Sequence, residues 1–339
     1  MPANSPIRIS FDEMYSQFLR ILRQHHFPEE KAKACASIFT NNSLDGVYSH
    51  GINRFPRFIE YTQKAYINPK AEAQNISSSG CLEQWDGQLG PGPTNALIAA
   101  DRAMELANKH GLGLVALANT NHWMRGGTYG WHCASKGYAF IGWTNTIANL
   151  PAWGATQCKL GNNPLVIAIP HQNEAIVLDM ALSQYSYGKL EATHQAGEQL
   201  PLPGGFNELG ELSSNPGDII KSGRPLPIGY WKGAGLSLML DLLATILSAG
   251  LSTAQITNQK HDEYSVSQVF IAIRLSQLQN FPTLEQSIQH ILNDFLAADK
   301  ISPETTLRYP GQHVLKTRSE NQQKGIPVHP DVWNTILSL

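Results

Sequence analysis

The longest apolar stretch of the chain, residues 233–250, places the strongest constraint on how the chain can fold. Its sequence, GAGLSLMLDLLATILSAG, would span about 27 Å as a helix. Asp241 stands near the middle, where a membrane span would have to bury a charge in lipid. The stretch therefore predicts a buried core helix of a globular protein rather than a membrane span.

Composition supports a globular chain and excludes two classes of partner. The chain has 339 residues, of which 42% are apolar and only 15% are charged, and its net charge is −2. A surface so poor in charge is typical of a chain partly covered by other protein, which indicates an oligomer. Because the chain has no excess of positive charge to attract phosphates or anionic lipid, neither a nucleic acid nor a membrane surface is expected as a partner.

The cysteines and the N-terminal residues indicate a reducing compartment. The four cysteines lie far apart and form no CxxC pair. A chain of this length folds without disulfides, so free thiols are expected. The first residues lack the basic and then apolar order of a secretion signal. We therefore expect a cytoplasmic protein.

Capping signals predict helices throughout the first seventy residues. Ser10 and Glu13 have the spacing of a capping box, which predicts a helix to about Gln24. Pro28, followed by two glutamates, predicts a second helix to about Leu44, and residues 55–64 have the pattern of a third.

From about Cys81 the pattern becomes mixed α/β. Strand-like apolar runs occur at residues 113–118, 138–144, 165–169, 175–180 and 269–273. Helices are predicted at residues 94–110, 283–296 and from Pro330 onward. Residues 196–229 are rich in Gly and Pro and are expected to form a long ordered loop.

The sequence lacks the common phosphate-binding and hydrolase motifs. Residues 111–116, GLGLVA, match a dinucleotide loop by letters, but they end a predicted helix and begin a strand. The Rossmann fingerprint needs the opposite order, so Gly111 is better explained as a helix C-cap. There is no P-loop, no GxSxG and no HExxH, and no metal site is expected.

Two short segments carry polar residues suited to chemistry. His50 lies between two glycines, with Arg54 four residues later and Arg57 seven residues later, which places an imidazole beside guanidinium groups. The alternative is a surface histidine that caps a helix. In the second segment, His122 and Arg125 follow a predicted strand, where α/β sheets often bind small molecules. The alternative there is an aromatic-rich turn that packs on the core.

Two further residues suggest a nucleotide. Asp179, at a strand end, is either an acceptor for ribose hydroxyls or the cap of a turn. Lys232 lies at the start of the apolar helix, where its charge opposes the helix dipole. A phosphate at this position would relieve that conflict.

Taken together, the segments resemble a known family. The chain is similar to the type-2 malate/L-lactate dehydrogenases, NAD(P)-dependent 2-oxoacid reductases, in six colinear segments: SHGINRFPRF, GLGLVALANTNHWMRGGTYGW, WGATQCKLGNNPLVIAIP, VLDMALSQYSYGKLE, LPIGYWKGAGLSLMLD and YPGQH. The resemblance covers essentially the whole chain. It implies a non-Rossmann NAD(P)-binding α/β fold, with a predominantly antiparallel sheet flanked by helices and an N-terminal helical segment. It also implies a homodimer.

The resemblance also assigns roles to residues. The family's catalytic histidine falls on His50. Its nicotinamide cofactor positions fall on Ala175, Ile176, Val177, Leu178, Asp179, Met180, Ala181, Trp231, Lys232, Gly311, Gln312 and His313. Relatives often carry an acid shortly after the Pro-Gly pair, whereas this chain has the uncharged Gln312 and His313 there. NADH is therefore the expected cofactor and NADPH the alternative.

These observations predict a reductase that transfers hydride from NADH to the keto group of a small sugar-derived 2-oxo acid. His50 is expected to donate the proton, Arg54 to hold the substrate carboxylate, and His122 to polarise the carbonyl or to serve structure alone. Within the family, the alternatives are oxidation of malate, lactate or ureidoglycolate, or reduction of a cyclic imino acid. Outside it, the alternative is a nucleotide-binding protein without turnover.

We expect three parts in the chain. They are residues 1–70, a helical segment that carries the catalytic histidine; residues 71–284, a central α/β region that binds cofactor and substrate; and residues 285–339, a helical segment that packs back on the core.

Overall fold

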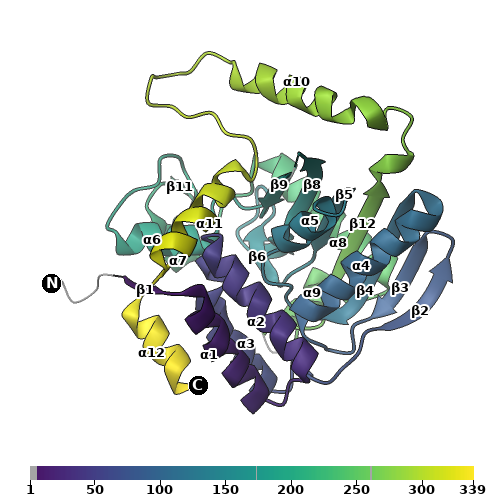
Figure 1. The fold of residues 1–339 in the computed structure, drawn as a ribbon. Helices are drawn as coiled ribbons and strands as arrows, with labels where there is room; N and C mark the ends of the chain where they lie inside the picture. Colours follow the sequence, from purple (N-terminus) through teal and green to yellow (C-terminus); the bar gives the residue numbers. More distant parts are fainter. Residues whose placement is uncertain (1–5, 173, 260–261) are drawn as a thin grey trace.

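A computed structural model describes residues 6–172, 174–259 and 262–339, and its centre is a mixed α/β sheet (Figure 1). Within these residues seven strands form the sheet in the order β2-β3-β4-β12-β5-β8-β9, and only the β3 and β4 pair is parallel. The strands are β2 (Gln74–Ser79), β3 (Leu82–Asp86), β4 (Leu112–Thr120), β5 (Tyr138–Thr144), β8 (Leu165–His171), β9 (Glu174–Met180) and β12 (Val266–Arg274). The predicted, predominantly antiparallel sheet is confirmed, although β2 and β3 were not predicted.

Helices cover both faces of this sheet. On one face, α4 (Gly92–His110) and α5 (Gly127–Ala134) pack against the strands through a core rich in alanine. On the other face lies α8 (Trp231–Ser248). Gly111 ends α4 with a left-handed φ of 84°, so the predicted C-cap is confirmed.

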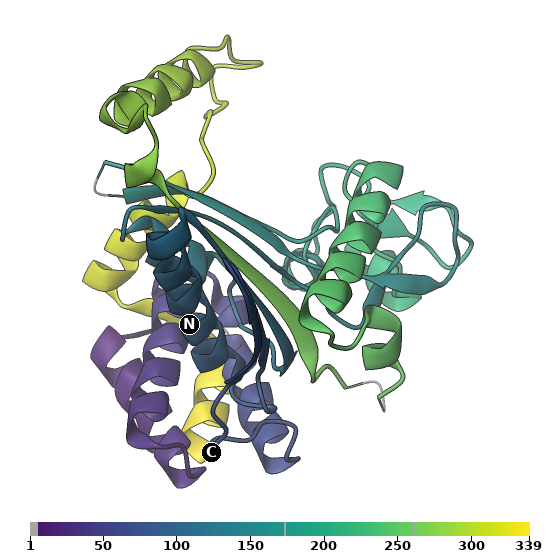
Figure 2. The same cartoon turned by 90° about the vertical axis from the view of Figure 1, so that its right-hand side faces the viewer.

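The N-terminal helices form a separate layer beside the sheet (Figure 2). The layer contains α1 (Phe11–Gln24), α2 (Glu29–Leu44) and α3 (Phe55–Gln63), together with α12 (Pro330–Ser338). Ser10 Oγ accepts the Glu13 N–H at 3.1 Å, which caps α1 as predicted. Phe18, Phe39 and Phe55 interlock the helices, with the rings of Phe18 and Phe55 stacked at 4.1 Å. Because Phe55 directly follows Arg54, this packing anchors the segment that carries His50.

Residues 196–229 are not the long loop that their composition predicts. They contain α7 (Pro216–Ser222) and a hairpin of β10 (Gly205–Phe206) and β11 (Leu212–Ser213), and they follow α6 (Tyr187–Gln195). A small core that includes Leu190, Leu200 and Ile219 holds these elements together. Apolar residues so far apart along the chain show no local periodicity, which is why the pattern was missed.

The apolar helix α8 is buried on one face only, so the prediction of a buried core helix is correct for that face alone within the single chain. Its exposed residues include Leu236, Leu238, Met239, Leu242, Leu243 and Ile246. Asp241 instead connects α8 to neighbouring segments, because its Oδ1 accepts hydrogen bonds from Asn145 Nδ2 at 3.0 Å and from the Thr253 N–H at 2.8 Å. None of the helices in the described part of the chain is both long and apolar enough to cross a membrane.

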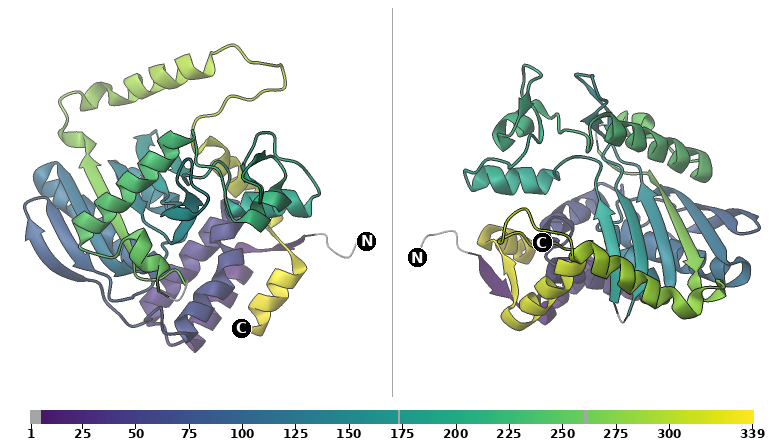
Figure 3. Two further views of the ribbon diagram at one scale, coloured as in Figure 1. Left: turned by 180° about the vertical axis from the view of Figure 1, so that it is seen from behind. Right: turned by 90° about the horizontal axis from the view of Figure 1, so that it is seen from above.

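The remaining elements lie at the edges of the molecule. Helix α10 (Leu284–Leu296) stands away from the body (Figures 1 and 3), whereas α11 (Gln312–Lys324) packs on α2. The short elements are β1 (Ile7–Ile9) paired with β13 (Ile326–Val328), β6 (Ala148–Pro151) paired with β7 (Cys158–Gly161), α9 (Thr253–Thr257), η3 (Leu275–Gln277) and η4 (Phe281–Thr283).

Candidate active site

His50 lies in a short linker between α2 and α3 that is pressed closely against α2. The linker consists of two 3₁₀ turns, η1 (Tyr48–His50) and η2 (Ile52–Arg54), joined at Gly51. A Cβ on Gly51 would lie 2.2 Å from Ser43 Oγ, so only glycine fits at this joint. Ser43 Oγ also accepts the Ile52 N–H at 2.8 Å. This packing fixes where His50 sits.

The structure places the His50 ring beside His122. The two ring centroids are 5.6 Å apart and the ring planes differ by 26°. On its other side, His50 Nδ1 is 3.0 Å from Ser49 Oγ. The two segments are 72 positions apart in sequence, so the fold brings together the two histidines that the sequence singled out.

His122 lies in the loop that follows β4, and its hydrogen bond selects one tautomer. The Met124 N–H donates to His122 Nδ1 at 2.9 Å. The neutral ring therefore carries its proton on Nε2. Nε2 is thus available as a hydrogen-bond donor to a substrate oxygen.

Both histidines are held in the neutral form in the free protein. Burial, together with the charges of Arg54 and Arg125, lowers the pKa of His50 to about 4. Burial and the neighbouring charges, of which Arg54 is the largest, hold the pKa of His122 well below its ordinary value. An anion bound at Arg54 would cancel part of this effect and favour protonation of His50.

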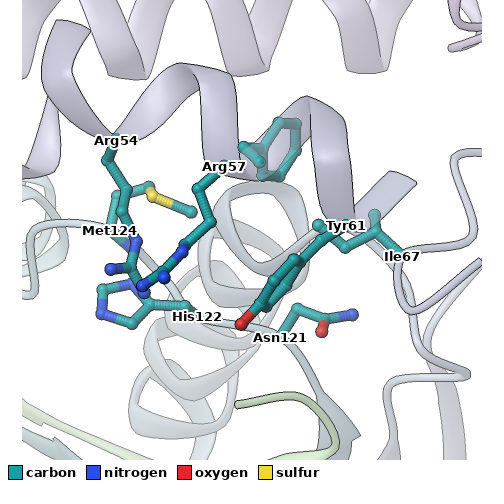
Figure 4. A pocket seen from close by; sticks show the side chains of 8 residues that line it. Arg54, Arg57, Tyr61, Ile67, Asn121, His122 and Met124 are labelled. Carbon is teal, nitrogen blue, oxygen red and sulfur yellow. The ribbon is translucent and has the colours of Figure 1, made fainter. Parts of the chain in front are cut away.

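Two arginines, Arg54 and Arg57, face a pocket that His122 also lines (Figure 4). The pocket is lined by Arg54, Arg57, Phe58, Tyr61, Ile67, Asn121, His122 and Met124. Among the described residues, the nearest carboxylate to the Arg54 guanidinium is that of Glu263, at 3.7 Å. This distance exceeds a hydrogen bond, so the Arg54 donors remain available for an anionic ligand.

Arg125, the third arginine of these segments, is committed elsewhere. Its guanidinium forms a buried ion pair with Asp45, the residue that follows α2. Arg318 on α11 joins the same carboxylate, with Nε 2.6 Å from Asp45 Oδ1. Asp45 therefore ties the segments of His50 and His122 to α11, and Arg125 is not available to bind substrate.

Two of the predicted cofactor segments meet at β9. The Val177 N–H donates to Pro310 O at 3.2 Å, and a Cβ on Gly311 would lie 3.2 Å from the Val177 backbone. Gln312 and His313 open α11 at this position. Beyond β9, the Ile228 N–H donates to Leu182 O at 2.9 Å, three residues before Trp231. The fold thus brings the segment around Gly311 against β9 and connects the segment that precedes Trp231 to the residues that follow this strand.

Hydrogen bonds connect this strand to His50. Asp179 accepts the Gly127 N–H at 2.7 Å, so its carboxylate lies at the start of α5. In the next residue, Thr128 Oγ1 donates to Asn42 Oδ1 at 2.8 Å, and Asn42 Nδ2 donates to His50 O at 3.0 Å. Asp179 therefore contacts the start of a distant helix rather than the cap of a local turn, and these hydrogen bonds connect β9 to the segment of His50.

Sequence reasoning missed two acidic residues of this site. Asp45 carries the buried ion pairs, and Glu263 faces both Arg54 and His122. Both residues act across long separations in sequence, and no local motif marks either of them.

Solved structures share this architecture over nearly the whole chain. A malate dehydrogenase from Entamoeba histolytica superposes with a TM-score of 0.92 at 23% identity, covering 98% of this chain and 97% of that one. A malate dehydrogenase from Pyrococcus horikoshii gives a TM-score of 0.88 at 26% identity, covering 98% of this chain and 95% of that one. The fold is therefore that of a class of dehydrogenases.

Sequence comparison assigns the family. The family model described as malate/L-lactate dehydrogenase matches residues 9–337, and the chain belongs to this family. It is therefore an oxidoreductase that acts on CH–OH and C=O groups. A 2,3-diketo-L-gulonate reductase from Salmonella paratyphi A is 46% identical over 333 residues, which are 98% of this chain and all of the relative. The reductase of the same name from Salmonella typhimurium is 45% identical over the same length.

Proposed function

We propose that this chain reduces a 2-oxo sugar acid with NADH, and that the reaction converts 2,3-diketo-L-gulonate to 3-dehydro-L-gulonate. The observation that carries this proposal is the stacked pair of His50 and His122 beside the available guanidinium of Arg54. The identity of the substrate is supported by relatives named 2,3-diketo-L-gulonate reductase, which are 46% identical over 98% of the chain.

Each residue of the site has a defined task in this reaction. Arg54 binds the substrate carboxylate and thereby orients the neighbouring carbonyl. His122 Nε2–H donates a hydrogen bond to the carbonyl oxygen. His50 gives a proton to the same oxygen as it becomes a hydroxyl. When bound, the reduced nicotinamide supplies the hydride.

The residues along β9 fit a nicotinamide nucleotide on a fold without a Rossmann loop. Two buried polar atoms at this position, Trp131 Nε1 and Gln312 Oε1, have no hydrogen-bond partner among the described residues. The glycine at 311 leaves room that a side chain would fill. Lys232 is exposed in the first turn of α8, where its charge suits a phosphate. The residues proposed to bind the cofactor are Ala175–Ala181, Trp231–Lys232 and Gly311–His313. NADPH is the alternative to NADH.

Two other properties belong to this proposal. The exposed apolar face of α8, with Leu236, Met239 and Ile246 among its residues, supports a homodimer in which a second copy covers it. All four cysteines are free thiols, which supports a cytoplasmic location.

A panel of 2-oxo acids tests the function. With NADH present, 2,3-diketo-L-gulonate should cause loss of absorbance at a higher kcat/KM than oxaloacetate, pyruvate, the oxo form of ureidoglycolate or a cyclic imino acid. The same panel with NADPH decides the cofactor. A steady absorbance with every compound, despite tight NADH binding, would instead establish a binding protein without turnover.

The variant Arg54→Lys is expected to lower kcat/KM for the 2-oxo acid about tenfold to a hundredfold, as for loss of a charge-assisted hydrogen bond. Lysine keeps the charge but lacks the planar fork, so KM should rise and kcat should fall, while NADH affinity stays unchanged. Steady-state kinetics and NADH titration measure these quantities.

A matched substrate without the carboxylate serves as the control for Arg54. The wild type should have a low kcat/KM for this substrate, and Arg54→Lys should lower that value little further. Equal losses on both substrates would mean that Arg54 supports the local fold. In that case Arg57→Lys, at the neighbouring guanidinium, should reproduce the pattern expected of the clamp.

A further inference from the structure

A buried carboxylate faces the groups that are proposed to hold the substrate. Glu263 lies shortly before β12, and its side chain is only 11% exposed. Its Oε1 is 3.7 Å from Arg54 Nη2 and 3.9 Å from His122 Nε2. This carboxylate has no role in the reaction described so far.

Two hydrogen bonds hold Glu263, one at its side chain and one at its backbone. Its Oε2 accepts the Ile147 N–H at 3.3 Å. The Glu263 N–H donates to the hydroxyl of Tyr61, a residue that lines the pocket, at 3.4 Å. The position of the carboxylate is therefore set by the fold and not by its contacts with Arg54 or His122.

Glu263 Oε1 has an unused capacity to accept hydrogen bonds. Both of its contacts are longer than a hydrogen bond. Because neither contact is a hydrogen bond, this oxygen can accept a hydrogen bond from a donor group of the ligand. A substrate carboxylate cannot be that donor, because like charges repel. A hydroxyl group can, because its O–H donates a hydrogen bond to the carboxylate oxygen.

We propose that Glu263 is a specificity-determining residue, whose Oε1 accepts a hydrogen bond from a hydroxyl group of a polyhydroxylated 2-oxo acid. This inference rests on the proposed function, because the substrate carboxylate must lie at Arg54. The same charge disfavours a substrate with a second carboxylate, such as oxaloacetate. A substrate without hydroxyls, such as pyruvate, leaves the carboxylate without its donor. Glu263 thus selects sugar acids over the simple acids used elsewhere in the family.

The variant Glu263→Gln tests this selection, because it removes the charge and keeps the shape. The kcat/KM for 2,3-diketo-L-gulonate should fall roughly tenfold to a hundredfold, as for a hydrogen bond to a charged group. The value for pyruvate should change by less than about threefold, and the value for oxaloacetate should rise as the repulsion is lost. The variant Glu263→Asp keeps the charge, so it should still reject oxaloacetate.

The neighbouring carboxylate provides a matched control. Asp262 Oδ2 is 3.5 Å from Lys64 Nζ, and its Oδ1 accepts the Tyr61 hydroxyl at 3.3 Å. Asp262→Asn should leave the ratios among the three substrates unchanged. If Glu263→Gln lowers kcat/KM equally for all three, Glu263 only positions Arg54 and His122, and the proposal is wrong.

A comparison in the wild type avoids any effect of a variant on folding. Hydroxypyruvate differs from pyruvate by one hydroxyl group, and it should be preferred at least tenfold, by the same hydrogen-bond argument. Equal kcat/KM values for the two acids would overturn the role of Glu263 while leaving a working reductase. Absence of NADH or NADPH oxidation with every 2-oxo acid would instead refute the proposed function itself.

Discussion

Replacing His50 by alanine is expected to lower kcat for reduction by roughly 10² to 10⁴, the usual contribution of a general acid. The imidazole is the group proposed to protonate the carbonyl oxygen, and without it that proton must come from water. Folding and NADH binding should stay near wild type, because the half-buried His50 ring has its hydrogen-bond contact with the adjacent Ser49 rather than with another element. Steady-state kinetics, with circular dichroism and NADH titration, measure the three properties.

The pH dependence of this variant separates catalysis from structure. In the free protein the pKa of His50 is lowered to about 4, and reduction requires the protonated ring. The wild-type kcat/KM for reduction should therefore rise as the pH falls from 8 toward 5, whereas the variant should lack this rise.

A second histidine provides the comparison. The control variant is His329→Ala, because His329 caps α12. It should show wild-type turnover and an unchanged pH profile. If His50→Ala turns over within a few-fold of wild type and keeps the pH dependence, His50 is not the acid.

The variant Asp45→Asn is expected to lower the free energy of unfolding by about 3–5 kcal/mol, the cost of breaking a buried ion pair from one side. Asp45 and Arg125 are only 7% and 6% exposed, so the variant leaves a buried guanidinium without its counter-charge. The second partner, Arg318, loses its carboxylate as well. Urea unfolding measures the change.

An exposed ion pair of the same layer is the control for Asp45. Lys33 Nζ lies 3.0 Å from Glu30 Oε1 on the surface of α2. Glu30→Gln should change the free energy of unfolding by less than about 1 kcal/mol, as for exposed pairs in general. Should Asp45→Asn cost no more than Glu30→Gln, the ion pairs of Asp45 do not hold the three segments together.

Local features of this chain were predictable because their causes lie within a few residues. The cap of α1 depends on Ser10 and the backbone three residues later. The left-handed end of α4 depends on a single glycine. Strand β5 was predicted with the bounds that the structure has, since its apolar run is continuous. The resemblance of the colinear segments added the family and a sheet that is predominantly antiparallel.

Features that depend on distant residues were not predictable. Glu263 lies near Arg54 although the two residues are 209 positions apart in sequence, and Asp45 pairs with Arg318, which is 273 positions away. Similarly, the composition of α8 signals burial but does not reveal that one face stays uncovered within the chain. The roles of His50, Arg54 and the cofactor segments stay predictions.

The sequence by itself determined the ends of some elements, such as the caps of α1 and α4 and the bounds of β5, and which residues carry suitable chemistry, because capping, periodicity and residue type act over short range. Only the tertiary structure decided that His50 stacks on His122, that Arg125 pairs with Asp45 and that Glu263 faces both Arg54 and His122. These contacts follow from how the helical layer packs on the end of the sheet. Such packing depends on the shape and burial of residues from all parts of the chain, which no local pattern contains.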